Sequence, residues 1–363
     1  MPFSPDDEAL CYGLLALCRA GFEKELAAEL DVFARKIGLE GFVRARDGQA
    51  WVSFEAYEGV AYADLAEACD WRKLVFARQI TPWFARVDAL PERDRATPLV
   101  TATREAGQRF SALFLETPDT DEAKQRSGFC RRFAEPMTKA LREAGLLRTS
   151  RVGLPELHIV FPDANSAWLC ASAPGKAAPW PMGIARLRMP REAGSRSTLK
   201  LAEALLALLG EDERSLALRP GMRAADLGAA PGGWTWQLAH RGVHVTAVDN
   251  GPMAASVLDT GMVEHLRADG FTWKPRRPLD WMVCDMVEQP SRIASLAADW
   301  IGSGRCRHTI FNLKLPMKKR LDAVEQCRTL IHKRLASVGA YDLRIKHLYH
   351  DREEVTAYLT LRR

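Results

Sequence analysis

Residues 226–238 read DLGAAPGGWTWQL, and this stretch decides the fold of the C-terminal half of the chain. A strand-like run at 223–227 ends in it, and a loop of small residues then leads directly into a helical pattern at 234–240. Glycines in such a loop allow the backbone to approach a ligand closely. A phosphate-binding loop would read G-x-G-x-x-G, but Pro231 occupies the loop here and the glycine spacing differs. The pattern therefore predicts a strand–loop–helix ligand site that does not hold a dinucleotide.

Regular alternation of strands and helices extends outward from this stretch. Helices are predicted at 198–209, 234–240 and 320–337. Strands are predicted at 223–227, 243–249, 263–269, 280–284, 309–313, 341–347 and 354–361. Alternation of this kind predicts an α/β fold with a doubly wound, Rossmann-like sheet of seven strands. Only a short turn at 349–353 joins the last two strands, so we expect them to form an antiparallel hairpin.

Acidic residues stand at the ends of four successive predicted strands: Asp226, Asp249, Asp269 and Asp285. Ligands of open α/β sheets bind beyond the carboxyl ends of the strands, so we expect all four to line one rim. S-adenosylmethionine suits such a site, because it is cationic and carries no phosphate. Taken alone, each aspartate would as readily cap a helix or a turn. We assign to the cofactor site Ser197, Gly228, Ala230, Pro231, Gly232, Gly233, Asp249 for the ribose hydroxyls, Asp269 for the adenine amino group, and Asp285.

The N-terminal half predicts two successive α+β units, 1–90 and 91–171. The first combines strands at 11–19 and 74–80, helices at 22–37 and 62–71, and a hairpin of 42–45 with 50–54, whose Asp-Gly turn at 47–48 favours a positive φ. The second combines helices at 97–106 and 121–144, a strand at 109–115 and a hairpin across 158–171. Residues 172–183, SAPGKAAPWPMG, lack periodicity and predict a linker over 172–185. The catalytic domain would then span 186–363.

Composition indicates a globular protein, with 47% hydrophobic and 27% charged residues and a net charge of +5. No apolar run approaches the length of a membrane span, and residues 1–8 are acidic where a secretory signal needs positive charge, so we expect a cytoplasmic protein. The eight cysteines contain no C-x-x-C pair. We read His240 and His244 as turn residues and expect no metal. Basic stretches at 124–132, 186–200 and 305–320 are either solvated faces or contacts to RNA phosphates.

DLGAAPGGWTWQL, SRSTLK (195–200), FNLKLPMKKR (311–320) and LYHDREEVT (348–356) together resemble the RlmM family. CRAGFEKELAAEL (18–30) is similar to the start of that family's N-terminal region, so the resemblance covers the whole chain. It implies a ferredoxin-like unit and a THUMP RNA-binding domain ahead of an FtsJ-type catalytic domain. It also implies 2′-O-methylation of a cytidine in large-subunit ribosomal RNA. Ala230 departs from the cysteine that is common in the family, at a position where the backbone makes the expected contact.

The resemblance further implies a Lys-Asp-Lys-Glu catalytic group, which matches Lys200, Asp285, Lys314 and Glu354 here. Glu353 is the alternative for the fourth position, although its side chain would point to the opposite face of an extended strand. We assign Lys314 as the base or hydroxyl-orienting group, Asp285 as its partner, and the other two as supports. A lysine base must lose its proton, and we expect Lys200 to lower the pKa of Lys314 by repulsion. A phosphate-contacting surface lysine is the alternative for Lys314.

Three classes of function fit these features: an RNA ribose methyltransferase, a methyltransferase of a base, protein or small molecule, and an RNA-binding protein with an inactive catalytic domain. Base amino-group enzymes of this fold often carry N/D-P-P-Y/F after the fourth strand, whereas 284–288 read CDMVE. All four catalytic candidates are present, which favours the first class. Its partner would be large-subunit rRNA, naked or in an early assembly precursor, since the reaction needs a 2′-hydroxyl.

Overall fold

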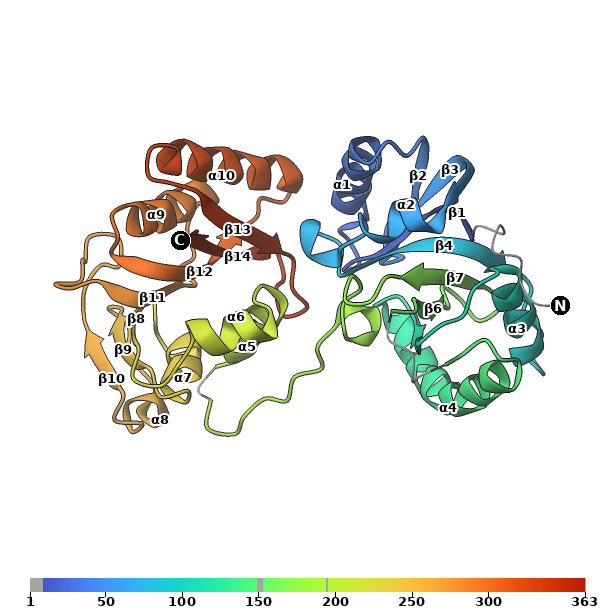
Figure 1. Cartoon of the computed structure of the whole chain (residues 1–363). Helices are drawn as coiled ribbons and strands as arrows, with labels where there is room; N and C mark the ends of the chain where they lie inside the picture. Colours follow the sequence, from blue (N-terminus) through green and yellow to red (C-terminus); the bar gives the residue numbers. More distant parts are fainter. Residues whose placement is uncertain (1–8, 149–152, 194, 363) are drawn as a thin grey trace. The chain divides into compact units, whose positions relative to one another are not determined.

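The computed structural model describes residues 9–148, 153–193 and 195–362, with the side chains of 124 and 125 also left out. The acidic segment 1–8, on which the absence of a signal was argued, lies outside these residues, as does the Lys124 side chain. Contacts within the chain divide it into two compact units, Met1–Ala185 and Arg186–Arg363. Figure 1 shows a sheet with flanking helices in each unit. In the described part of the chain, no helix has the length and apolarity that crossing a membrane requires.

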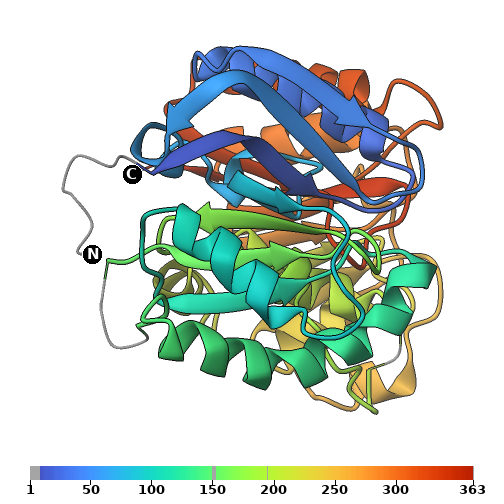
Figure 2. The same cartoon turned by 90° about the vertical axis from the view of Figure 1, so that its right-hand side faces the viewer.

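The first unit is built on one mixed sheet of seven strands in the order β2-β3-β1-β4-β7-β6-β5. Its strands are β1 (Leu10–Leu17), β2 (Gly41–Ala45), β3 (Trp51–Ala61), β4 (Gln79–Val87), β5 (Ala112–Glu116), β6 (Glu156–Val160) and β7 (Ala167–Ser172). Its helices are α1 (Glu23–Lys36), α2 (Tyr62–Ala66), α3 (Ala96–Glu105) and α4 (Asp121–Glu143), with short turns η1 (Trp71–Lys73) and η2 (Pro181–Gly183). Figure 2 shows this unit face on, with α3 and α4 packed near each other.

The two predicted N-terminal units share this sheet, because β4 pairs with β1 on one side and with β7 on the other. Both pairings are antiparallel, so the hydrogen-bond ladder runs without interruption from residues of the first predicted unit into those of the second. A tryptophan cluster spans the junction, where the rings of Trp83 and Trp168 lie 5.0 Å apart. The described residues of the first unit therefore share one core.

The segment 172–185, predicted to be an interdomain linker, packs on the first unit. Ala173, Ala177, Ala178, Ile184 and Ala185 are buried. The Ala178 amide donates to Gln79 Oε1 at 2.9 Å, and the Lys176 carbonyl accepts from the Trp71 amide at 3.0 Å. Gly183 has φ +66°, and a Cβ there would lie 2.0 Å from the Arg78 carbonyl oxygen. Small residues at these positions permit close packing and do not indicate flexibility.

The second unit is the predicted doubly wound sheet, with seven strands in the order β10-β9-β8-β11-β12-β14-β13. Its strands are β8 (Arg223–Leu227), β9 (His244–Val248), β10 (Val263–Leu266), β11 (Leu279–Cys284), β12 (Cys306–Lys314), β13 (Tyr341–Lys346) and β14 (Glu354–Leu361). Neighbouring strands from β10 to β12 are parallel, and β14 is antiparallel to both β12 and β13. The predicted C-terminal hairpin is thus confirmed.

Helices cover both faces of this sheet, as Figure 1 shows with α9 and α10 over one face and α5 and α7 over the other. The helices are α5 (Thr198–Ala207), α6 (Glu211–Ala217), α7 (Gly233–Ala239), α8 (Ala255–Leu258), α9 (Pro290–Gly302) and α10 (Arg320–Leu335). Apart from Asp280, the central strand β11 is apolar, with Trp281, Met282 and Val283 all buried. A strand that is covered on both faces needs such a sequence. Because β8, β9 and β11 run parallel to one another, their carboxyl ends meet at one rim of the sheet.

Candidate active site

The glycine-rich loop runs from the end of β8 to the start of α7. Its glycines stand where a side chain would clash with a neighbour or where the backbone has a positive φ. Gly228 has φ +77°, and a Cβ there would lie 2.4 Å from Met286 Cγ. Gly232 has φ +115°, a conformation that L side chains rarely adopt. A Cβ on Gly233 would lie 2.2 Å from Ser197 Oγ. The loop therefore packs tightly against the start of α5, which brings Ser197 to it.

A cavity of about 390 Å³ opens at the carboxyl ends of β8 to β11. It is lined by Gly228, Ala230, Val248, Asp249, Asn250, Ala268, Asp269, Gly270, Phe271, Asp285, Met286, Val287 and Glu288. Five of the predicted cofactor residues are thus brought together at this cavity. Four predicted cofactor residues are not among its lining residues: Pro231, Gly232 and Gly233 of the loop, and Ser197 at the start of α5.

The expectation that four aspartates line this rim is wrong for Asp226. Its side chain points into the interior, where it accepts a hydrogen bond from Thr235 Oγ1 at 2.6 Å. Burial raises the pKa of Asp226 to about 7. Asp226 therefore ties β8 to α7 and supports the loop from below.

Backbone amides fix the carboxylates that do line the cavity. Asp249 Oδ2 accepts from the Ala230 amide at 3.0 Å, and its Oδ1 accepts from the Gly251 amide at 2.7 Å. Asp269 Oδ1 accepts from the Phe271 amide at 2.9 Å. A carboxylate oxygen has two lone pairs, so each of these groups keeps acceptor capacity for a ligand. The orientation of both side chains is set before any ligand enters.

Two lysines and two acids from four separate elements converge next to this cavity. Lys200 lies on α5, Asp285 directly after β11, Lys314 at the end of β12 and Glu354 at the start of β14. Lys314 Nζ lies 3.0 Å from Asp285 Oδ1, and Lys200 Nζ lies 3.5 Å from Asp285 Oδ2. Both ammonium groups also pair with Glu354, one with each carboxylate oxygen. The pairing of β12 with β14 sets Lys314 opposite Glu354 in register.

Glu353, the alternative fourth member, lies elsewhere. Its side chain is 59% exposed and pairs with Arg320, whose Nη2 lies 2.7 Å from Glu353 Oε2. Adjacent residues of an extended strand point to opposite faces, which separates the two glutamates. The geometry therefore brings Glu354, and not Glu353, to the lysines.

The expected lowering of the Lys314 pKa is wrong, because its surroundings raise it. Burial lowers the pKa of Lys314, but the charges of Asp285 and Glu354 and their hydrogen bonds outweigh burial and raise it above its usual 10.5. Lys200 does lie nearby, but it shares both carboxylates with Lys314. Two cations and two anions thus form a neutral cluster in which Lys314 is an ammonium group.

Sequence reasoning missed the residues that hold this cluster. Asn312 Nδ2 donates to Asp285 Oδ1 at 2.6 Å. Its position two residues before Lys314 on a strand was a usable signal, since alternate residues share a face. Glu203, one helical turn after Lys200, accepts from the amides of Tyr349 and His350 at 2.8 and 3.0 Å. It thereby anchors the turn that precedes Glu354, which no local pattern indicates.

The basic stretches are largely exposed. In the second unit Arg186, Arg188, Arg191, Arg196, Lys318 and Lys319 all lie on the surface. The Arg186 guanidinium lies 5.4 Å from the centre of the Tyr349 ring, beside the turn that Glu203 anchors. In the first unit Arg131 and Arg132 of α4 are exposed.

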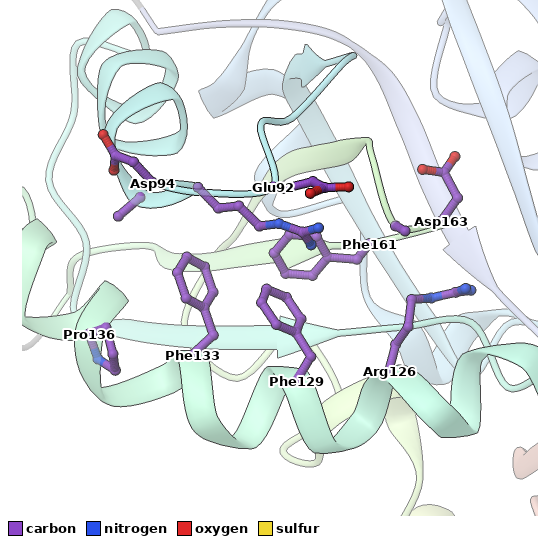
Figure 3. Close-up of a pocket in the computed structure, with 11 residues that line it drawn as sticks. Glu92, Asp94, Arg126, Phe129, Phe133, Pro136, Phe161 and Asp163 are labelled. Atoms are coloured by element: carbon purple, nitrogen blue, oxygen red, sulfur yellow. The ribbon is translucent and has the colours of Figure 1, made fainter.

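A second cavity, of about 630 Å³, lies in the first unit and is shown in Figure 3. Phe129 and Phe133 of α4 rise toward Phe161, and the first two rings stack with centres 5.0 Å apart. Glu92, Asp94 and Asp163 also line this cavity. Arg95 and Arg126 line it as well, so its charged lining is mixed.

Comparison with known proteins assigns all three parts of the chain. Residues 12–81 match the RlmM ferredoxin-like domain, residues 94–173 the N-terminal domain of ribosomal RNA large subunit methyltransferase M, and residues 193–331 the FtsJ-like methyltransferase family. Among solved structures, TrmN from Thermus thermophilus is similar at 17% identity and a TM-score of 0.35, covering 96% of this chain and 99% of that one.

Several similar curated proteins carry the name ribosomal RNA large subunit methyltransferase M. The protein of Aromatoleum aromaticum is 71% identical over 100% of this chain and 99% of its own length. That of Thauera aminoaromatica is 67% identical over 99% of both chains, and that of Xanthomonas campestris is 52% identical over 95% of this chain and 98% of its own. Identity at this level over nearly full length, together with the three domain matches, shows that this chain belongs to the ribosomal RNA large subunit methyltransferase M family.

Proposed function

We propose that this protein transfers a methyl group from S-adenosylmethionine to the 2′-hydroxyl of a cytidine in large-subunit ribosomal RNA. The observation that carries the proposal is the position of Asp285, which lines the cofactor-sized cavity and also pairs with both lysines. The proposed methyl-donor cavity and the two lysines that could handle the proton are therefore both in contact with Asp285. The family membership supports the same reaction.

The cavity fits the proposed cofactor in size and in chemistry. A volume of about 390 Å³ is within the range of small-molecule sites. Its charged lining is acidic, with Asp249, Asp269, Asp285 and Glu288, which favours a cationic ligand that carries hydroxyl groups. Asp249 would hold the ribose hydroxyls and Asp269 the adenine amino group, while Gly228 and Ala230 provide backbone contact. When bound, S-adenosylmethionine supplies an already activated methyl group.

The chain's own residues then have to orient the ribose hydroxyl and handle its proton. We assign this task to Lys314, which points to the cluster from the end of β12. As an ammonium group it donates hydrogen bonds and orients the hydroxyl oxygen. To act as a base it must lose a proton, and a cation bound beside Asp285 would favour that loss by competing for the carboxylate. Lys200 and Glu354 hold the geometry around it.

The test is Lys314→Ala in single-turnover methyl transfer, with the exposed Lys318→Ala as the control. General acid–base groups contribute about 10²- to 10⁴-fold, so we expect a loss of that size with cofactor affinity nearly unchanged. Lys318→Ala should keep the wild-type rate at saturating RNA. Retained turnover in Lys314→Ala would remove the catalytic assignment.

Product analysis tests the proposed position of the methyl group. A 2′-O-methylated nucleotide resists alkaline cleavage at its 3′ phosphate, because that cleavage uses the free 2′-hydroxyl. A base-methylated product would be cleaved and would refute the proposal. Mapping of modified rRNA by mass spectrometry, with naked rRNA and with precursor particles as substrates, would identify the nucleotide and the form of RNA that is used.

We further propose that the first unit places the RNA, through a THUMP-like segment within 91–171 that includes α4. Arg131 and Arg132 offer phosphate contacts on that helix, and the exposed arginines of 186–196 offer others next to the active site. Lysine and arginine contacts to phosphate provide affinity without base specificity. Selection of one cytidine would then rest on how these contacts orient the RNA.

A further inference from the structure

Behind the catalytic cluster, three buried polar side chains form a continuous chain that ends on Asp285. Asn312 Nδ2 lies 2.6 Å from Asp285 Oδ1, and Thr356 Oγ1 lies 2.7 Å from Asn312 Oδ1. Thr356 Oγ1 also lies 3.0 and 3.1 Å from the two carboxyl oxygens of Asp351. Asn312, Thr356 and Asp351 each have no exposed surface. None of them is among the four residues assigned to catalysis.

The number of protons on each group determines which side chain donates and which accepts in each hydrogen bond of this chain. Asp285 sits between two ammonium groups, so it is ionised and can only accept. Asn312 must therefore present its amide group to Asp285 and its carbonyl oxygen to Thr356. An oxygen that only accepts needs a donor opposite it, so the Thr356 hydroxyl gives its single proton to Asn312. That proton is then no longer available for Asp351.

We propose that Asp351 carries a proton and donates it to Thr356, so that a one-way hydrogen-bond chain from Asp351 through Thr356 and Asn312 positions Asp285 for methyl transfer. The remaining carboxyl oxygen of Asp351 is satisfied as an acceptor, since Oδ2 receives the Leu348 amide at 3.0 Å. The proposal deepens the proposed function, because it assigns positioning residues to the same site.

The electrostatics of the interior agree with a neutral Asp351. Burial, followed by the charge of Glu354, raises the pKa of Asp351 well above its ordinary value. A neutral Asp351 does not compete with Asp285 and Glu354 for the two lysines. It also leaves Asn312 with a fixed donor, which restricts rotation of the Asp285 carboxylate and keeps its Oδ1 within reach of Lys314.

The Asp351→Asn variant distinguishes two possible roles of Asp351, that of a neutral hydrogen-bond donor and that of a charged carboxylate. Asparagine can accept from the Leu348 amide through its carbonyl and donate to Thr356 through its amide group, as a protonated aspartate does. We expect single-turnover rates within about threefold of wild type for Asp351→Asn and Thr356→Ser, which keep the chain. Asp351→Ala and Thr356→Val break it and should lower that rate by about 10- to 100-fold, because the buried Asn312 side chain that holds Asp285 then loses its fixed donor.

Two further measurements on these variants distinguish a positioning role from a loss of folding. The dissociation constant for S-adenosylhomocysteine should change less than about twofold in all four variants, since the cavity carboxylates that hold the ligand are untouched. The pH–rate profile of Asp351→Asn should overlay that of wild type. An Asp351→Asn rate as low as that of Asp351→Ala would show that a carboxylate charge is required and would overturn the proposal.

Infrared spectroscopy gives a test that does not depend on methyl transfer. The wild-type protein at pH 8 should show a protonated-carboxyl band that Asp351→Asn lacks, whereas Asp285 and Glu354 remain ionised. Absence of that band from folded wild-type protein would refute the protonated Asp351 even if the proposed reaction is correct. Presence of the band without 2′-O-methyl product would instead refute the proposed function alone.

Discussion

Replacing Glu354 by glutamine should destabilise the second unit far more than the same change at the neighbouring Glu353. Glu354 is 5% exposed and pairs with both Lys200 and Lys314. The substitution leaves two ammonium groups with one carboxylate, Asp285. Removing one partner of a buried pair costs about 3–5 kcal/mol, and the partial exposure of the lysines favours the lower end. We expect a loss of about 3 kcal/mol.

Calorimetry measures this loss directly. For a unit of this size a loss of about 3 kcal/mol lowers Tm by about 6–12 °C. S-adenosylhomocysteine should raise the transition of the second unit and so identify it. The raised pKa of Lys314 means that its ion-pair stabilisation is complete below the unfolded value of 10.5 and is lost only as pH rises through the higher folded value. A measurement at pH 7.5 therefore captures the full effect.

Glu353→Gln is the matched control, because it removes the same charge from the adjacent residue. Glu353 is 59% exposed and makes a surface pair with Arg320, which contributes about 0–1 kcal/mol. Its Tm should change by no more than about 4 °C. Equal shifts for the two variants, or no shift for Glu354→Gln, would refute the description of a buried cluster that Glu354 completes.

Three further outcomes follow from contacts described above. Asp249→Ala should weaken cofactor binding by about 10- to 100-fold in calorimetric titration, because it removes the proposed acceptor for the ribose hydroxyls and frees the Ala230 amide; an unchanged affinity would place the ribose elsewhere. His158→Leu should destabilise the first unit by about 1–3 kcal/mol in urea unfolding and leave cofactor affinity unchanged, since the buried ring bonds Glu116 at 2.9 Å. RNA affinity should fall steeply with salt, and Arg131→Ala with Arg132→Ala should each reduce the log–log slope by about one unit; a flat response would contradict phosphate contacts by α4.

The local sequence pattern predicted the bounds of an element correctly where that element's own residues determine its structure and burial. The predicted strands 223–227 and 354–361 coincide with β8 and β14, because apolar runs between turn residues leave few alternatives. The four catalytic candidates converge as the resemblance implied, since sheet order and the β12–β14 register bring their elements together. The resemblance therefore named four residues that the fold brings together.

The failures share one physical cause, which is contact with residues distant in sequence. The predicted strand 74–80 begins at 79 in the structure, because the amides of Val75 and Phe76 bond the Glu29 carboxylate and not a neighbouring strand. The raised pKa of Lys314 depends on Asp285 and Glu354, neither of which is near it in sequence. No local pattern carries such information.

The pairing of β4 with β7 bears on how the N-terminal half can be dissected. Family matches end at 81 and resume at 94, which suggests a cut between them. Yet a fragment that ends at 81 would lack the rest of β4, so β1 would lose part of its neighbouring strand. A fragment that begins at 94 would lack β4 altogether, so the edge of β7 would be unpaired. Bare sheet edges template aggregation. A fragment of this half that keeps every strand paired must therefore contain the whole sheet and continue to Ala185.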